Sequence, residues 1–253
     1  MATVRFERCR EPKLLTTYSI RSIFVQCMAC PIAALVLSFS LGSIFHPEAL
    51  YSYRWTCGIV HLPSISRVMN MPLERTIFQL LILFSVPFRL FVLLKHWMEF
   101  SRREVPRVYV LARRVLVFCG IGEVLFLSLL SVIGERESGD IHVLLFVAFA
   151  VFSYIYFVVM SLLTRWTYPQ GQEQRRKKLQ LIFLASVTAT IPVIFVFFIL
   201  YNVYCIPATY ELFAIFEYAT VAGIYGFHVT SFWKMTGYIR VYHSNLKMHS
   251  VRV

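Results

Sequence analysis

Residues 143–163 read VLLFVAFAVFSYIYFVVMSLL, and this run contains no charged side chain. A helix needs about 20 apolar residues to cross the roughly 30 Å of hydrocarbon in a bilayer. Because hydrocarbon offers backbone groups no hydrogen-bond partner, such a run is predicted to be helical. Outward from it, five further runs have a similar length and are largely apolar; they span residues 23–45, 76–94, 115–133, 181–201 and 212–233. The sequence therefore predicts an all-α, polytopic membrane protein with six transmembrane helices.

The overall composition supports the same class of protein. Of the 253 residues, 58% are hydrophobic and 15% are charged, whereas about a quarter of the residues in a typical soluble domain are charged. The 13 acidic residues include a single aspartate, Asp140, which excludes most paired-aspartate chemistry and Asp-x-Asp metal sites. No metal site and no cofactor are expected. The net charge of +12 does not indicate nucleic-acid binding, because the basic residues lie in short segments between and beside the apolar runs.

The lysines and arginines are distributed unequally between the two sides of the predicted membrane domain. Of the 25, 20 lie before the first run, after the last run, or in the connections that follow the second and fourth runs. The connections on the opposite side carry only Arg54, Arg67, Arg75 and Arg136. Because basic residues collect on the cytosolic side of membrane proteins, both termini are predicted to be cytosolic. The expected organisation is a cytosolic arm (1–22), a six-helix domain (23–233) with a luminal loop (46–75), and a cytosolic tail (234–253).

The six cysteines fall in different environments under this topology. Cys57 and Cys205 lie in luminal connections, whereas the other four lie within the apolar runs or the arm: Cys27, Cys30, Cys119 and Cys9. Disulfides form and persist in oxidising compartments. One disulfide, between Cys57 and Cys205, is therefore expected, and two free luminal thiols are the alternative.

Four ionisable side chains lie within the runs, where charged groups are costly and commonly functional: Arg89, Glu123, Glu217 and His228. At 1.5 Å per helical residue, Arg89 and His228 lie about 9 Å from the cytosolic ends of their helices, and Glu123 about 13 Å. These three side chains are predicted to meet. The cluster either fixes how the helices pack or belongs to a functional site.

Glu217 lies near the luminal end of the last run, three helical turns from His228 and on the same face of the helix. It approaches the predicted loop that carries His61, Ser64 and Ser66. A carboxylate, an imidazole and a hydroxyl within reach of one another suffice for acyl transfer. Because loops are generally rich in serine, an accidental grouping is the alternative.

Several short stretches resemble a known family of membrane proteins. These are LPSIS at 62–66, PFR at 87–89 and Glu123, together with YC at 204–205, FAIFEY at 213–218, FH at 227–228 and Trp233. The stretches resemble the Frag1/DRAM/Sfk1 family. His61 lies outside the family's pattern, and the fourth and fifth runs match it only in composition.

The resemblance implies a multi-pass protein of the Golgi membrane, with the ER membrane as a second location. It implies a role in the lipid remodelling of glycosylphosphatidylinositol (GPI) anchors, in which a removed fatty acid is replaced by a saturated one. The implied partners are GPI-anchored proteins, the GPI lipid, the membrane and an acyl donor. The protein would be a required factor, either the acyltransferase itself or an accessory protein.

Seven residues are assigned expected roles on this basis. Glu217 is the expected catalytic base or orienting carboxylate. The residues expected to shape the loop near the lipid headgroup are Pro63, Ser64 and Ser66. The residues expected to hold the bundle or to line a cavity are Arg89, Glu123 and His228. The alternative function is that of a non-enzymatic lipid-binding protein or an autophagy-type membrane modulator of the same family.

Overall fold

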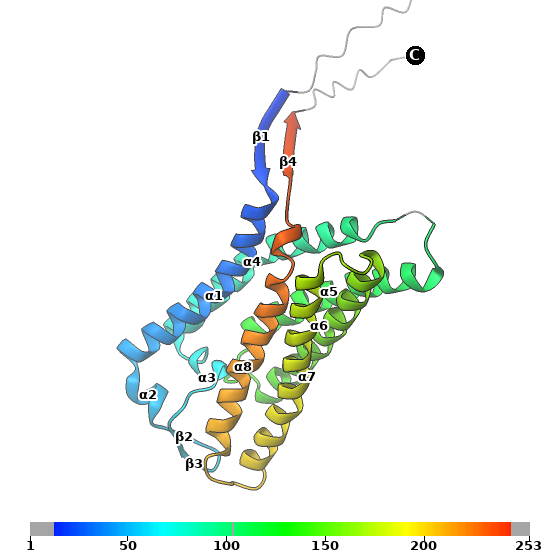
Figure 1. Cartoon of the computed structure of the whole chain (residues 1–253). Coiled ribbons are helices and arrows are strands. Elements are labelled where there is room, and N and C mark those ends of the chain that lie inside the picture. Colours follow the sequence, from blue (N-terminus) through cyan, green and yellow to red (C-terminus); the bar gives the residue numbers. More distant parts are fainter. Residues whose placement is uncertain (1–12, 103, 244–253) are drawn as a thin grey trace, which may run out of the picture.

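The computed structural model of the chain describes residues 13–102 and 104–243. Six long helices dominate this part: α1 (Ile20–Phe45), α4 (Pro72–Glu99), α5 (Arg107–Val132), α6 (Gly139–Thr167), α7 (Gln174–Asn202) and α8 (Thr209–Val229) (Figure 1). Each is long and apolar enough to cross a membrane, α8 together with the 3₁₀ turn η1 (Phe232–Lys234) that follows it. The predicted all-α, six-span membrane fold is confirmed.

The helices extend beyond the apolar runs from which they were predicted. α4 begins at Pro72, because proline suits the first turn of a helix, where its missing N–H would have no partner in any case. α6 begins after Ser138, whose hydroxyl accepts a hydrogen bond from the Ile141 N–H. α7 begins at Gln174 and carries basic residues in its first turns. The first turns of these three helices therefore lie outside the apolar runs and carry polar residues.

Both described ends of the chain lie at the same end of the bundle, which we call the terminal end (Figure 1). The opposite end, which holds residues 46–71 between α1 and α4, we call the loop end. α1 packs along α4, α5 along α6, and α7 along α8. An even number of crossings returns the chain to the side from which it started, so this arrangement follows from the number of helices.

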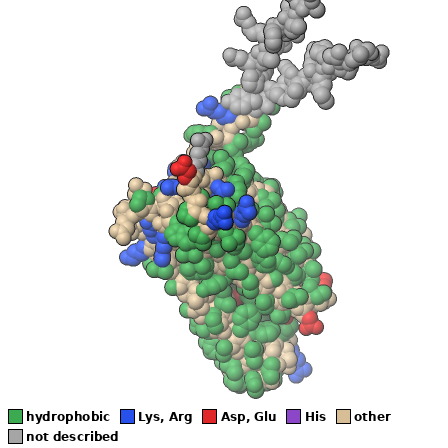
Figure 2. All heavy atoms as spheres, turned by 90° about the vertical axis from the view of Figure 1, so that its right-hand side faces the viewer, with side chains coloured by type: hydrophobic (Ala, Val, Ile, Leu, Met, Phe, Trp, Pro, Cys, Tyr) green, Lys and Arg blue, Asp and Glu red, His purple; other side chains and the backbone are tan. Residues whose placement is uncertain are grey.

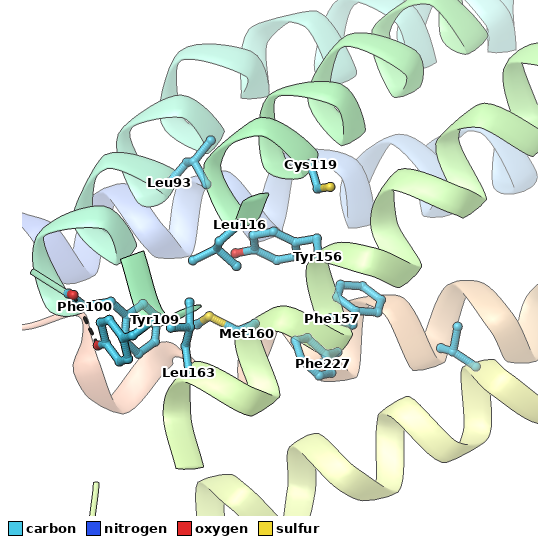
Figure 3. Close-up of a cluster of buried hydrophobic side chains, with 11 residues drawn as sticks. Leu93, Phe100, Tyr109, Leu116, Cys119, Tyr156, Phe157, Met160, Leu163 and Phe227 are labelled. Carbon is cyan, nitrogen blue, oxygen red and sulfur yellow. Dashed lines mark hydrogen bonds between the residues drawn. The ribbon is translucent and has the colours of Figure 1, made fainter. Parts of the chain in front are cut away.

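A core of buried hydrophobic side chains from α4, α5, α6, α7 and α8 lies in the terminal half of the bundle (Figure 3). Phe157 on α6 stacks on Phe227 of α8 with ring centroids 4.2 Å apart. The Tyr109 hydroxyl donates to the carbonyl oxygen of Phe100 at 3.2 Å and also contacts the Thr167 hydroxyl at 2.8 Å. These bonds satisfy a polar group that would otherwise be costly in this environment.

A glycine brings α5 and α6 into close contact. A Cβ atom built on Gly122 would lie 2.2 Å from the ring of Phe152, and that ring also packs against Phe118 and Phe126. Gly122→Ala is expected to lower the free energy of unfolding by about 1–3 kcal/mol, because the ring is held from both sides. Thermal unfolding in detergent measures the change.

The matched control is Gly139→Ala, since nothing lies within 4 Å of a Cβ atom at Gly139. This control should leave the unfolding temperature unchanged or raise it. The double variant Gly122→Ala/Phe152→Leu should recover part of the loss. Equal effects of the two single substitutions would contradict the close contact.

The terminal end carries a two-stranded antiparallel sheet. β1 (Lys13–Ser19) pairs with β4 (Tyr238–His243), with Thr17 opposite Arg240. The sequence analysis assigned no secondary structure to these segments, because each strand forms only against a partner that lies more than 200 positions away along the chain. The remainder of the arm and tail, including Cys9, lies outside the described residues.

The loop end is folded rather than extended. It contains the helix α2 (Pro47–Tyr51), the hairpin of β2 (Tyr53–Trp55) and β3 (Gly58–Val60), and the short helix α3 (Ile65–Val68). A disulfide joins Cys57 in the hairpin turn to Cys205 in the connection between α7 and α8. The loop is thereby tied to the beginning of the last helix.

The sides of the bundle are hydrophobic, and Figure 2 shows this surface with lysines and arginines gathered towards the terminal end. Phe84 and Phe118, for example, expose 60% and 67% of their surface. In a soluble protein such a continuous apolar surface would be a liability, whereas lipid chains cover it without cost. The surface therefore agrees with the membrane assignment.

Candidate functional site

Two adjoining cavities lie inside the bundle, one at its loop end and one that extends from there towards the terminal half. The inner cavity, of about 90 Å³, is enclosed by α1, α3, α4, α5, α6 and α8. The outer cavity, of about 330 Å³, lies between α6, α7, α8 and the folded loop. The two share four lining residues: Ser66, His142, Phe146 and Glu217. We call the three polar members of this set, Ser66, His142 and Glu217, the polar junction.

The first pair in the polar junction is Ser66 with His142. The Ser66 Oγ lies 3.1 Å from the His142 Nε2, and the His142 Nδ1 lies 2.8 Å from the carbonyl oxygen of Ile133. A carbonyl oxygen only accepts hydrogen bonds, so the Nδ1 carries a proton. In the neutral imidazole the Nε2 is then the acceptor, and the Ser66 hydroxyl donates to it.

The turn between α5 and α6, residues 133–138, sets the position of the Ile133 carbonyl. Arg75 holds this turn from α4: it pairs with the Glu137 carboxylate, and its Nη2 donates to the Val132 carbonyl oxygen at 2.7 Å. The hydrogen bond from Arg75 also lowers the pKa of Glu137. The Asn70 Nδ2 donates to Glu135 at 2.8 Å. The imidazole of His142 is thus oriented by a turn that is itself fixed.

The third member, Glu217, holds the loop onto α8. It is 5% exposed, and its Oε2 accepts a hydrogen bond of 2.7 Å from the Ile65 backbone N–H. The neighbouring Tyr218 hydroxyl donates to the Pro63 carbonyl oxygen, and the Tyr210 hydroxyl donates to the Ser64 Oγ at 3.0 Å. Three side chains of α8 therefore hold residues 63–65, and Ser66 follows directly.

Ser64 and His61 have structural rather than reactive surroundings. The Ser64 Oγ caps α3 by accepting from the Arg67 N–H at 3.1 Å. His61 is exposed, and its Nδ1 contacts the carbonyl oxygen of Tyr51 at 3.1 Å. The suggested grouping of Glu217 with the His61 imidazole is not assembled, because that ring lies outside both cavities. The imidazole at the polar junction is His142, which the sequence analysis did not select.

A second cluster of polar side chains lies at the end of the inner cavity that is farthest from the polar junction. The Glu123 Oε1 accepts a hydrogen bond of 2.8 Å from the His228 Nε2 and lies 3.9 Å from the Arg89 Nη1. Arg89 also contacts the Ser85 hydroxyl through its Nε at 3.2 Å. The predicted meeting of these three side chains is present, and they both link α4, α5 and α8 and line the cavity.

The lining of the outer cavity combines apolar and acidic side chains. Its aromatic members include Phe146, Phe195 and Phe213. Its acidic members include Glu135 and Asp140. Burial raises the pKa of the Glu135 carboxyl, although the hydrogen bond from Asn70 acts in the opposite direction. Such a cavity accommodates a molecule with an apolar chain and a polar head.

Among the described residues, no group of three or more histidine, cysteine, aspartate and glutamate side chains could hold a metal ion. The ionisable groups of the site are instead bonded to one another or to the backbone. The chemistry available from these residues is acid–base and nucleophilic chemistry.

The family model described as the Frag1/DRAM/Sfk1/Cwh43P N-terminal domain matches residues 19–237. The chain belongs to this family. The matched region contains all six long helices and both cavities of this Frag1/DRAM/Sfk1 family member.

The curated relatives of this family member carry related names. The chain is 29% identical to "Post-GPI attachment to proteins factor 2" of Drosophila pseudoobscura pseudoobscura, over 90% of this chain and 91% of the relative. The protein of the same name in Drosophila melanogaster is also 29% identical, with the same coverage. "Acyltransferase PGAP2" of Xenopus tropicalis is 28% identical over 86% of both chains. No solved structure matches the chain at a significant level.

Proposed function

We propose that this protein acts in the lipid remodelling of GPI anchors, at the step in which a saturated fatty acid is added to the anchor lipid. Relatives named post-GPI attachment to proteins factor 2, aligned along almost the whole chain, support the pathway. The relative named as an acyltransferase supports the reaction. The partners are then GPI-anchored proteins, the GPI lipid and an acyl donor.

The observation that carries this proposal is the pair of cavities that meet at the polar junction. An acyl-transfer site for a lipid needs apolar space for chains beside polar groups at the depth of the ester. The outer cavity supplies aromatic walls, and Ser66, His142 and Glu217 supply the polar groups. The arrangement therefore suits a lyso-lipid hydroxyl and a fatty acyl carbonyl brought to one place.

The same proposal includes the orientation of the protein in the membrane and its location in the cell. The excess of basic residues at the terminal end favours cytosolic termini and a luminal loop end. The organisation is then an arm (1–22), a membrane domain (23–233) with its luminal loop (46–75), and a tail (234–253). GPI anchors lie in the luminal leaflet, so the loop end faces its substrate in the Golgi membrane.

Lipid mass spectrometry of GPI anchors from cells that lack this protein tests the function. We expect anchors with fewer saturated chains, together with lyso-anchors, and recovery when the wild-type protein is restored. Unchanged acyl composition in the deficient cells would contradict the proposal.

Glu217 has the surroundings of an orienting carboxylate. The amide of Glu217→Gln retains an oxygen that can accept the Ile65 N–H, so this variant should restore most of the remodelling. Glu217→Leu leaves that N–H without its partner, which costs about 1–3 kcal/mol, and should reduce remodelling about tenfold or more. The measurement is the saturated fraction of the anchor lipid in deficient cells that express each variant.

The control for this comparison is Glu48→Leu, which removes a carboxylate from an exposed position of α2, outside both cavities. It should restore remodelling fully. If Glu217→Gln is folded but as inactive as Glu217→Leu, the carboxylate acts as a base and the orienting role is wrong.

A further inference from the structure

Ser66 and His142 have the arrangement of a nucleophile with its general base. A serine is a weak nucleophile until an adjacent base takes its proton, and the base must itself be held by a third group. The Ser66 hydroxyl meets the His142 Nε2 at 3.1 Å, and the Ile133 carbonyl holds the opposite nitrogen at 2.8 Å. All three requirements are met by residues on three separate segments: α3, α6 and the turn 133–138.

The pair is also placed where a substrate could reach it. Both side chains line the inner and the outer cavity, and both are half-buried. Two other candidates that line the cavities, Ser64 and His228, are already occupied. The Ser64 hydroxyl caps α3 and accepts from Tyr210, while the imidazole of His228 donates to Glu123. A reactive role at the polar junction therefore falls to Ser66 and His142.

We propose that Ser66 is the residue that carries the acyl chain in this protein and that His142 is its general base. The proposal rests on the proposed function and assigns its catalytic residues. The acyl donor is a lipid ester or a thioester, because either presents a carbonyl carbon bonded to a group that can leave.

The reaction has two half-steps. In the first, the Ser66 Oγ bonds to the donor's carbonyl carbon while its proton passes to the His142 Nε2. The bond from that carbon to the donor's oxygen or sulfur breaks, and the leaving group takes the proton. In the second, the hydroxyl of the lyso-lipid attacks the Ser66 ester and gives its proton to His142; the Oγ leaves and regains a proton. No oxidant or reductant is needed.

Glu135 favours the protonated, positively charged form of the His142 imidazole. Its carboxyl lines the outer cavity with His142, and in its ionised form it stabilises the imidazolium that exists during each half-step.

The test is to detect the acyl chain on the protein. The full chain is reconstituted in vesicles that contain either phosphatidylcholine with deuterated palmitoyl chains or unlabelled lipid plus deuterated palmitoyl-coenzyme A, without any acceptor. Intact-protein and peptide mass spectrometry should find one palmitoyl group on Ser66 in at least one arm. The arm that labels identifies the donor as a lipid ester or a thioester, and labelling in neither arm overturns the proposal.

Variants give a signature that a structural role would not produce. Ser66→Ala should abolish the adduct, whereas Ser66→Cys should carry the chain as a thioester that neutral hydroxylamine releases. His142→Gln should slow labelling by about 10²–10⁴-fold. Ser101→Ala and His61→Gln are matched controls at exposed positions and should label as the wild type does.

Folding and function are separated by two further comparisons. Labelling of Ser66→Cys shows that position 66 can be changed without loss of the fold. Ser66→Ala that keeps the adduct, or that restores normal anchors in deficient cells, overturns the assignment of Ser66 while leaving the proposed function in place. Deficient cells with unchanged anchors would instead overturn the proposed function.

Discussion

Replacing Glu123 by alanine is expected to lower the free energy of unfolding by about 3–5 kcal/mol, the largest loss among the single substitutions considered for this protein. Arg89 and Glu123 expose only 8% and 3% of their surfaces. The substitution leaves the Arg89 guanidinium charged and buried without its carboxylate, and it removes the acceptor of the His228 Nε2. Thermal and denaturant unfolding of the purified protein in detergent measures the loss.

A paired substitution distinguishes the buried charge from simple loss of volume. In Arg89→Met/Glu123→Met both charges are removed and apolar volume is kept, so most of the stability should return. Glu48→Ala, at an exposed position in α2, should cost less than about 1 kcal/mol. If the double variant is less stable than Glu123→Ala, the single-variant loss does not arise from an unpaired charge.

The second large effect is expected from the disulfide between Cys57 and Cys205. These residues are 148 positions apart, and the bond fixes the β2–β3 hairpin to the connection before α8. Cys57→Ser/Cys205→Ser should lower the free energy of unfolding by about 2–4 kcal/mol. Helices that remain inserted in lipid already restrict the unfolded chain, so the larger value expected for a free chain of this length is not reached.

Reduction provides a direct comparison for this prediction. A reductant should bring the unfolding midpoint of the wild type down to that of the double variant and leave the variant unchanged. Cys30→Ala, which changes a half-buried free thiol in α1, serves as the control and should behave as the wild type. A wild-type midpoint that does not respond to reductant would show that the bond does not contribute to stability.

The six helices could be predicted because the bilayer imposes a length and a composition on each of them. A run such as residues 143–163 needs no partner to be recognised, since its own backbone bonds and apolar surface suffice in lipid. The sheet of β1 with β4 could not be predicted in this way. Each strand depends on the other, and the local sequence of Lys13–Ser19 contains no sign of which distant segment it pairs with.

The candidate site likewise contains one part that could be predicted from the sequence and one part that could not. The meeting of Arg89, Glu123 and His228 was predictable because helix rise converts sequence position into depth, and charges in hydrocarbon find partners. His142 could have been noticed as an imidazole one turn into its helix, at the same end as Glu217. Its pairing with Ser66 could not have been predicted, because the depth of a residue in the membrane does not specify how its helix is rotated about its axis.

Order along the chain and chemical composition alone predicted six membrane-spanning helices, a shared side for both termini, and the position of each ionisable group along its helix. Three-dimensional folding alone established that Ser66 meets His142, 76 positions away. The physical reason is that hydrophobic burial in lipid depends on length, whereas the rotation of helices about their axes depends on contacts between them. Here those contacts include Gly122 against Phe152, and the hydrogen bonds of Arg75 that hold the turn 133–138 and thereby aim the imidazole.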